Sequence, residues 1–177
     1  MKDLTEHFVA GELVYDGRLL KVHNDRVRLP DGTEGMREHV RHSGAVAVVA
    51  LFDDGSVLLE RQFRYPHGRV FIEIPAGRLE PGEPHLETAK RELLEETGYA
   101  AAEWRSVGVI HNAIGYSDEA IEIFLARGLQ PGTAKLDAGE FLETFTVPLD
   151  EAVAMARDGR ISDSKSVIGL LWVSLLL

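Results

Sequence analysis

The chain of 177 residues contains no cysteine. Disulfide bonds, thiolate zinc sites and cysteine nucleophiles are therefore excluded from its chemistry. Basic residues are in the minority, with 19 Lys and Arg against 29 Asp and Glu and a formal net charge of −10. This balance gives no electrostatic footprint for nucleic acid or for an anionic membrane. An anionic substrate would accordingly need a cation or a local arginine cluster to hold it.

Both ends of the sequence lack a long apolar run. The N-terminal segment "MKDLTEHFVAGEL" does not have the pattern of a signal peptide. The C-terminal segment "SVIGLLWVSLLL" is apolar but too short to cross a bilayer, and we expect it to be the buried end of a helix. Cytoplasmic location is the default expectation. Hydrophobic residues make up 45% of the chain, which is enough for an ordinary core.

Turn residues divide the sequence into short strands and three predicted helices. Asp16-Gly17 and Asp31-Gly32 indicate hairpins in the first forty residues, and "DDG" separates two apolar strands within residues 45–64. Helices are predicted over residues 82–98, 149–159 and 164–177. The irregular order of elements favours an α+β fold with a mixed sheet between helices. We expect a β-rich N-terminal arm over residues 1–42 and one domain over residues 43–177.

The first predicted helix carries an unusual concentration of carboxylates. Glu92, Glu95 and Glu96 lie within one and a half turns, where like charges at these spacings repel each other. Their stripe adjoins the apolar stripe that contains Leu93, so they are expected to be partly shielded from water. A solvated glutamate-rich helix is one explanation. The other is a hard cation such as Mg²⁺ or Mn²⁺, which binds oxygen ligands and keeps several waters.

The spacing around these glutamates matches a known motif. Residues 77–99 read "GRLEPGEPHLETAKRELLEETGY", which resembles the Nudix box, G-x5-E-x7-R-E-U-x-E-E-x-G-U, where U is a bulky apolar residue. Every fixed position of the pattern is present, and the order of flanking elements is also similar. The resemblance implies an α/β/α sandwich, the Nudix fold. It also implies hydrolysis of a nucleoside diphosphate linked to another group.

The resemblance further implies a metal site and its supporting residues. The implied ligands of Mg²⁺, with Mn²⁺ as an alternative, are the carboxylates of Glu92, Glu95 and Glu96 and the backbone carbonyl of Ala76. Arg91 would hold a glutamate in place by a charged hydrogen bond, and Glu83 would be a structural partner. Bound metal would neutralise a pyrophosphate and activate a water molecule. The crowded carboxylates and the acidic net charge would then be compatible with an anionic substrate.

The segment before the box narrows the substrate class. Its sequence, "VLLERQFRYPHGRVFIEIPAG", resembles the R-Q-[FY]-R-[YF] and E-[IL]-P-A-G elements of ADP-ribose pyrophosphatases and nucleoside-diphosphate-sugar hydrolases. By this resemblance Arg64 contacts phosphate, or else forms a surface ion pair, and Glu73 contacts a ribose or the metal-bound region. Arg41 is a weaker substrate-binding candidate. In this branch the N-terminal sheet commonly swaps across a homodimer, so a homodimer is expected.

Two positions depart from the ADP-ribose pattern. Ile114 stands where a proline usually precedes glycine, and Ser43 stands where proline is frequent. The first departure weakens ADP-ribose as the preferred substrate and favours GDP-mannose or another nucleoside diphosphate sugar. Ser117, Asp118 and Glu119 either line the sugar end of the site or form an ordinary polar turn.

The resemblance to this Nudix branch also implies a general base on a loop after the box. Glu140 lies in the glycine-containing segment "LDAGE", and Glu143 lies in the strand "FLETFTV" on the face shared with Phe145 and Val147. We therefore expect Glu143 to point towards the interior or the cleft. Glu140 is the favoured base because a loop glutamate can move when substrate arrives. If neither acts, Glu95 or Glu96 within the box would activate the water.

The main interpretation is a Mg²⁺-dependent pyrophosphatase that cleaves ADP-ribose or a nucleotide sugar into a nucleoside monophosphate and a sugar phosphate. Its partners would be this small-molecule substrate and a second copy of the chain, with neither nucleic acid nor membrane. The alternatives are a Nudix hydrolase of dinucleoside polyphosphates and a non-catalytic Nudix ligand sensor. A purely structural acidic helix would require the complete motif to be chance.

Overall fold

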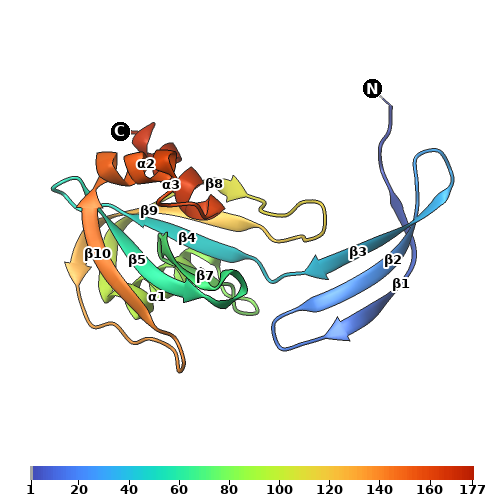
Figure 1. The fold of residues 1–177 in the computed structure, drawn as a ribbon, viewed down its shortest axis with the longest axis horizontal. Helices are drawn as coiled ribbons and strands as arrows, with labels where there is room; N and C mark the ends of the chain where they lie inside the picture. The colour runs from blue at the N-terminus through green and yellow to red at the C-terminus, as the bar shows by residue number, and fades with distance from the viewer. Residues whose placement is uncertain (1) are drawn as a thin grey trace. The chain divides into compact units, whose positions relative to one another are not determined.

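The computed structural model describes residues 2–177 and contains the expected mixture of short strands and helices (Figure 1). Cα packing divides the chain into two compact units. Unit 1 consists of Met1–Gly44 and His111–Glu119, and unit 2 consists of Ala45–Ile110 and Ala120–Leu177. The division into an arm over residues 1–42 and a domain over residues 43–177 stays a prediction.

Unit 1 is built on a three-stranded antiparallel sheet. Strands β1 (His7–Asp16), β2 (Lys21–Arg28) and β3 (Glu34–Arg41) follow one another in sequence and in space. The two Asp-Gly turns connect them, as the turn chemistry predicts. At the second turn Gly32 has φ 86, and its amide donates to the carbonyl of Leu29 at 2.9 Å. Glycine adopts this left-handed conformation without steric cost.

Unit 2 contains seven strands in two sheets. One sheet has the order β10-β5-β6 and the other β7-β4-β9-β8. Strands β4 and β9 are parallel, whereas the other pairs are antiparallel, so the predicted mixed sheet is confirmed. The strands are β4 (Ala45–Ala50), β5 (Ser56–Arg64), β6 (Arg69–Glu73), β7 (Ala76–Arg78), β8 (Tyr99–Ile110), β9 (Ile121–Pro131) and β10 (Leu142–Pro148); a short 3-10 helix, η1 (Tyr65–His67), joins β5 to β6.

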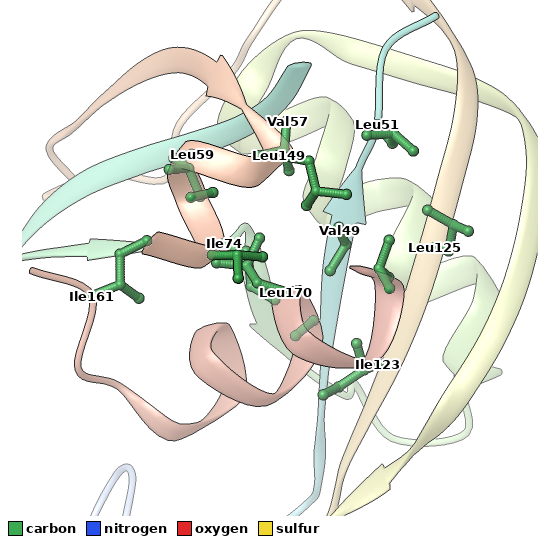
Figure 2. Packing of buried hydrophobic residues seen from close by; sticks show 14 of the residues in the cluster. Val49, Leu51, Val57, Leu59, Ile74, Ile123, Leu125, Leu149, Ile161 and Leu170 are labelled. Carbon is green, nitrogen blue, oxygen red and sulfur yellow. The ribbon is translucent and has the colours of Figure 1, made fainter. Parts of the chain in front are cut away.

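Three helices cover the sheets of unit 2 from opposite sides. Helix α1 (His85–Thr97) lies on one side, and α2 (Leu149–Asp158) and α3 (Ser164–Ser174) lie on the other (Figure 1). Alternate residues of the fully buried strand β4 explain this arrangement, because successive side chains of a strand point to opposite faces. Val49 packs with α2 and α3 residues (Figure 2), whereas Val48 packs with α1 residues. The expected α/β/α sandwich is confirmed.

The predicted helix ends are close to the observed ones. Pro84 is the N-cap residue of α1, and Gly98 ends that helix with φ 74 and an amide hydrogen bond to Leu94. The expectation that the C-terminal segment is buried is wrong for its last residues. Helix α3 ends at Ser174, and three exposed leucines follow it. Within residues 2–177 the helices are too short or too polar to span a membrane.

Candidate active site

The short strand β7 brings backbone close to the acidic face of α1. A Cβ atom at Gly77 would lie 1.9 Å from the carboxyl carbon of Glu92, so any larger residue here would displace the end of the Glu92 side chain from its present position. The amide of Ala76, the neighbouring residue, donates to Oε2 of Glu96 at 3.1 Å. The fold therefore places two of the predicted metal-binding carboxylates against the strand that carries the predicted carbonyl ligand.

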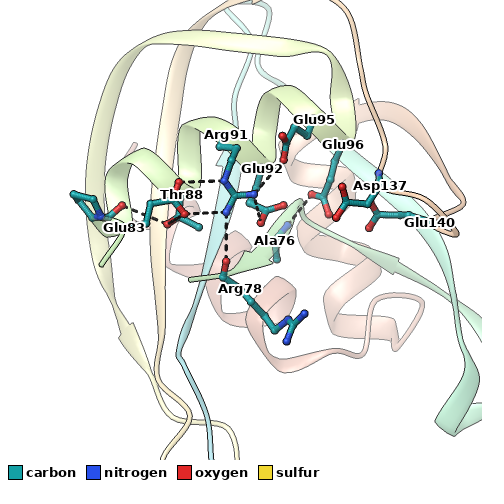
Figure 3. A network of polar contacts seen from close by, with 11 residues as sticks. Ala76, Arg78, Glu83, Thr88, Arg91, Glu92, Glu95, Glu96, Asp137 and Glu140 are labelled. Atoms are coloured by element: carbon teal, nitrogen blue, oxygen red, sulfur yellow. Dashed lines mark hydrogen bonds and ion pairs between the residues drawn. The ribbon is translucent and has the colours of Figure 1, made fainter. Parts of the chain in front are cut away.

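Arg91 is the centre of a polar network along the outer part of this face (Figure 3). Its guanidinium donates to Glu83 at 3.1 and 2.9 Å, to Glu92 at 2.8 Å and to Glu95 at 3.1 Å. The hydrogen bonds from Arg91, and next the one from the Thr88 hydroxyl, lower the pKa of Glu83 to about 2. The same pairing with Glu83 raises the pKa of Arg91. Arg91 thus holds three carboxylates of the motif.

On the inner part of the acidic face, Glu96 does not share in the hydrogen bonds that Arg91 donates. Glu96 is only 5% exposed, and burial raises its pKa well above the ordinary value. The nearby charges of Glu60, Glu92 and Glu140 add to this shift. Burial also raises the pKa of Glu92, although its ion pair with Arg91 opposes the shift. These carboxylates are therefore held where their ionised forms are costly unless a cation is close.

Glu60 on strand β5 is one of the carboxylates whose charge acts on Glu96. Its position in the sequence did not indicate a role in the site. It is fully buried, and neither of its carboxylate oxygens has a hydrogen-bond partner among the described residues. Burial raises its pKa to about 8. An unpartnered buried carboxylate costs free energy. The only sequence signal is that a glutamate interrupts the apolar run "VLLE".

The residues fit a hard divalent cation by the chemistry of their donors. The cluster offers carboxylate and backbone oxygens, which Mg²⁺ and Mn²⁺ prefer. Two of its carboxylates have raised pKa values, and Glu60 is unpartnered. No group of three acidic or histidine side chains within residues 2–177 is already gathered around one point. Glu92 and Glu95 face Arg91 instead, so binding an ion would require their side chains to turn.

A second polar network includes the predicted substrate residues Arg64 and Glu73. The Arg64 guanidinium donates to both carboxylate oxygens of Glu73 at 2.7 and 2.8 Å. The buried Lys165 also pairs with Glu73, and it donates to Asp163 at 3.0 Å. Burial alone would raise the pKa of Glu73, but Arg64 and Lys165 outweigh it and lower the pKa. Arg64 thus forms an ion pair with a buried carboxylate rather than with a surface one.

Lys165 is a further residue that the sequence did not reveal. Its position near the start of α3 is far from the motif in sequence, and an isolated lysine there is usually solvated. The structure buries its side chain, which is 12% exposed, between Glu73 and Asp163. Burial alone would lower the pKa of Lys165, but Asp163 and Glu73 outweigh that effect and raise it. Lys165 therefore remains charged.

The two candidate bases differ in their surroundings. Glu140 precedes β10, accepts from the Gln62 amide at 3.4 Å and lies on the side of Glu96 (Figure 3). Glu143 accepts from Arg61 at 2.9 Å, and its side chain is 76% exposed. Of the two directions expected for Glu143, the interior or the cleft, the interior is therefore wrong. Glu143 lies near the start of β10, which is an edge strand. The hydrophobic cluster that packs against Phe145 does not extend to this end of the strand.

The remaining predicted substrate residues lie in unit 1. Arg41 donates to Asp118 at 3.1 Å, and the same carboxylate accepts from the backbone amide of His42 at 2.7 Å. The Ser117 hydroxyl accepts from the amide of Glu119 at 3.1 Å. These contacts make residues 117–119 an ordered polar turn beside the end of β3. A role in sugar binding stays a prediction.

Comparison with known protein families gives two matches. Residues 41–168 match the NUDIX domain, and residues 9–40 match the nucleoside diphosphate sugar hydrolase N-terminal domain. The first match contains all the residues of the Arg91 network, together with Glu60 and Lys165. The second match covers most of the three-stranded sheet of unit 1.

Comparison with individual proteins supports the same family. The chain is 38% identical to an ADP-ribose pyrophosphatase of Bacillus subtilis (strain 168), covering 99% of this chain and 96% of that protein. It is 39% identical to a methanol dehydrogenase activator of Bacillus methanolicus, covering 96% and 93%. A solved structure, described as the crystal structure of an ADP compounds hydrolase, superposes with a TM-score of 0.88 at 24% identity and covers 100% of this chain and 97% of that one. This last similarity supports the fold.

Proposed function

The chain belongs to the Nudix family, and from this premise we propose that it hydrolyses the pyrophosphate bond of ADP-ribose or a related nucleoside diphosphate sugar. The products are a nucleoside monophosphate and a sugar phosphate. The observation that carries the proposal is the packing of the complete motif. Arg91 holds Glu83, Glu92 and Glu95, while the partly buried Glu92 and the buried Glu96 lie against β7 with raised pKa values. This arrangement suits a cation-dependent hydrolase.

The finer part of the proposal concerns the metal. Nudix hydrolases generally use a divalent metal ion, and here we assign Mg²⁺, with Mn²⁺ as an alternative. Glu92, Glu95, Glu96 and the carbonyl of Ala76 would hold it. When bound, such an ion neutralises phosphate charge and lowers the pKa of water. Arg91 orients the ligands from the outer side.

Other residues would bind and position the substrate. The Arg64 side chain is 40% exposed, and Glu73 fixes its guanidinium in one orientation. A fixed guanidinium suits a phosphate oxygen, because less side-chain freedom is lost on binding. Glu140, held by Gln62 beside the acidic cluster, would take the proton of the attacking water. Arg41, Ser117 and Glu119 are assigned to the sugar or nucleotide.

The assembly is assigned as a homodimer formed through unit 1. Large apolar side chains are exposed along its strands, among them Phe8 and Met36. Exposed apolar patches commonly mark interaction sites, and these side chains support a contact through this sheet. Analytical ultracentrifugation is expected to give a dimer mass. A monomer at micromolar concentration would contradict the assignment.

A substrate panel tests the proposed reaction. The protein is incubated with Mg²⁺ and ADP-ribose, GDP-mannose, UDP-glucose, diadenosine polyphosphates or dATP, and the products are identified by mass. At least one nucleotide sugar is expected to have a higher kcat/KM than dATP. Ile114, which replaces the usual proline and is exposed, favours GDP-mannose or another nucleoside diphosphate sugar over ADP-ribose. A preference for dATP or a dinucleoside polyphosphate would contradict the substrate class, and no cleavage at all would favour a ligand sensor.

A further inference from the structure

A fully buried carboxylate faces the acidic cluster from strand β5. Glu60 is 0% exposed, and both of its oxygens lack hydrogen-bond partners among residues 2–177. Alternate residues of a strand share a face, so Leu58, Glu60 and Gln62 point to the same side of β5. Leu58 packs with Ala89 and Leu93 of helix α1. The side chain of Glu60 is therefore directed to the side of the sheet that α1 covers.

The neighbours of Glu60 on this face connect it to the cluster. Leu93 and Glu96 are three positions apart on α1, so they lie on the same side of the helix. Leu58, which packs with Leu93, is two positions from Glu60 on β5. At the next position of the same face, Gln62 contacts Glu140. Glu60 thus lies between the residues that pack on α1 and the residue that contacts the candidate base.

The two basic side chains whose charges act on Glu60, Arg64 and Lys165, form their ion pairs with other carboxylates. Arg64 uses two hydrogen bonds on Glu73, the residue opposite Glu60 in the β5–β6 register. Lys165 pairs with the same Glu73 and with Asp163. They reduce the local negative charge but donate no hydrogen bond to Glu60. A buried carboxylate with no partner calls for an explanation, and a bound ion or water is the one that suits its place beside the acidic cluster.

We propose that Glu60 is a further ligand of the divalent cation held by Glu92 and Glu96, bound directly or through a metal-bound water. The site would then take ligands from β5 as well as from α1 and β7. This inference rests on the proposed function in its use of a divalent cation, and it does not depend on which substrate is cleaved.

Cation binding without substrate tests the inference. Mn²⁺ affinity is measured by electron paramagnetic resonance and calorimetry for the parent, Glu60→Gln and Glu96→Gln, and melting temperatures are measured in EDTA and in Mn²⁺. Glu60→Gln is expected to weaken Mn²⁺ binding by about 10–100-fold, the range found when an outer-shell partner of a metal is removed, or by more. Its melting temperature in EDTA should equal or exceed that of the parent, while the Mn²⁺-induced increase should shrink.

A matched variant on the same helix controls for charge alone. Glu87 is exposed on α1 and pairs with Lys90 at the surface, so Glu87→Gln removes one negative charge outside the site. Its Mn²⁺ affinity should stay within a factor of two to three of the parent's, roughly the scale of screened surface charges. If Glu60→Gln fails to fold, Glu60→Leu, which is similar in volume and apolar, provides the same comparison.

The outcomes separate this inference from the proposed function. Parental Mn²⁺ affinity in Glu60→Gln, alongside weakened binding in Glu96→Gln, would overturn the inference and leave the proposed function standing. Weakened binding in Glu60→Gln, with no nucleotide sugar cleaved by the parent, would support the inference and contradict the function. Parental affinity in both variants would overturn the inference together with the whole cation site.

Discussion

Two groups of carboxylates near helix α1 differ in what neutralises them. Glu83, Glu92 and Glu95 accept hydrogen bonds from Arg91 on the outer part of the helix. Glu96 and Glu60 lie deeper, where burial and neighbouring carboxylates raise their pKa values; within residues 2–177 no arginine or lysine donates a hydrogen bond to them. Arg91 neutralises the first group, whereas the second is left for a bound cation or a proton to neutralise.

The difference shows how one motif serves two purposes. An arginine neutralises carboxylates through fixed donors, which stabilises the fold. A mobile cation provides charge that can contact both protein and phosphate oxygens. Glu92 belongs to both groups, since it contacts Arg91 and its own pKa is raised by burial. If the Glu92 side chain rotated from Arg91 towards a bound cation, metal binding would change the hydrogen bonds of the Arg91 network.

The largest effect is expected from Glu96→Gln. Glu96 is 5% exposed, and its charge is opposed by burial and by Glu60. Replacing it should leave the melting temperature in EDTA unchanged or slightly higher. Turnover of a nucleotide sugar should fall by at least about 10³-fold, because a cation contributes several kcal/mol to such reactions. Equal Mg²⁺-induced melting shifts in parent and variant would remove Glu96 from the metal site.

An intermediate effect is expected at the candidate base. Glu140→Gln should lower kcat by roughly 10²–10⁴-fold, the usual contribution of a general base. KM and Mn²⁺ affinity should change little, because Glu140 is not assigned as a ligand. Glu143→Gln is the matched comparison, since Glu143 is exposed and paired with Arg61.

The steady-state rates of these two variants assign the base. Near-parental kcat in Glu140→Gln together with a large loss in Glu143→Gln would transfer the role to Glu143. Near-parental kcat in both would place water activation within the motif, with Glu95 or Glu96 as the group responsible.

The smallest effect is expected from Glu83→Gln and appears as a change in pH dependence. Arg91 lowers the pKa of Glu83 from 4.5 to about 2. The folded state therefore binds this proton more weakly than the unfolded state, so the stabilisation is present above pH 4.5 and is lost as the pH falls through about 2. The free energy of unfolding is measured with urea in EDTA at several pH values between 5 and 3. As the pH falls through this range, it should decrease more steeply for the parent than for Glu83→Gln. Parallel pH profiles would indicate that Arg91 compensates by pairing with Glu92 and Glu95 alone.

The sequence by itself determined the motif and the elements that carry it. Turn residues located the hairpins, and Gly98 located the end of α1 within a residue. The spacing of Glu92, Glu95 and Glu96 placed them in one stripe along a helix, because a helix has a fixed period. These features depend on neighbours in sequence, so they are readable without the fold.

Only the tertiary structure decided which distant side chains join the motif. Glu60 and Lys165 have ordinary sequence neighbours, and their burial follows from the strands and helices that pack around them. The exposure of Glu143 has the same origin, since its strand lies at a sheet edge where the packed layer ends. Burial and pairing are set by packing between segments far apart in the chain. Local periodicity places a side chain on one face of a helix or strand. Packing between distant segments determines whether that face is exposed to solvent or covered, and whether its polar groups find hydrogen-bond partners.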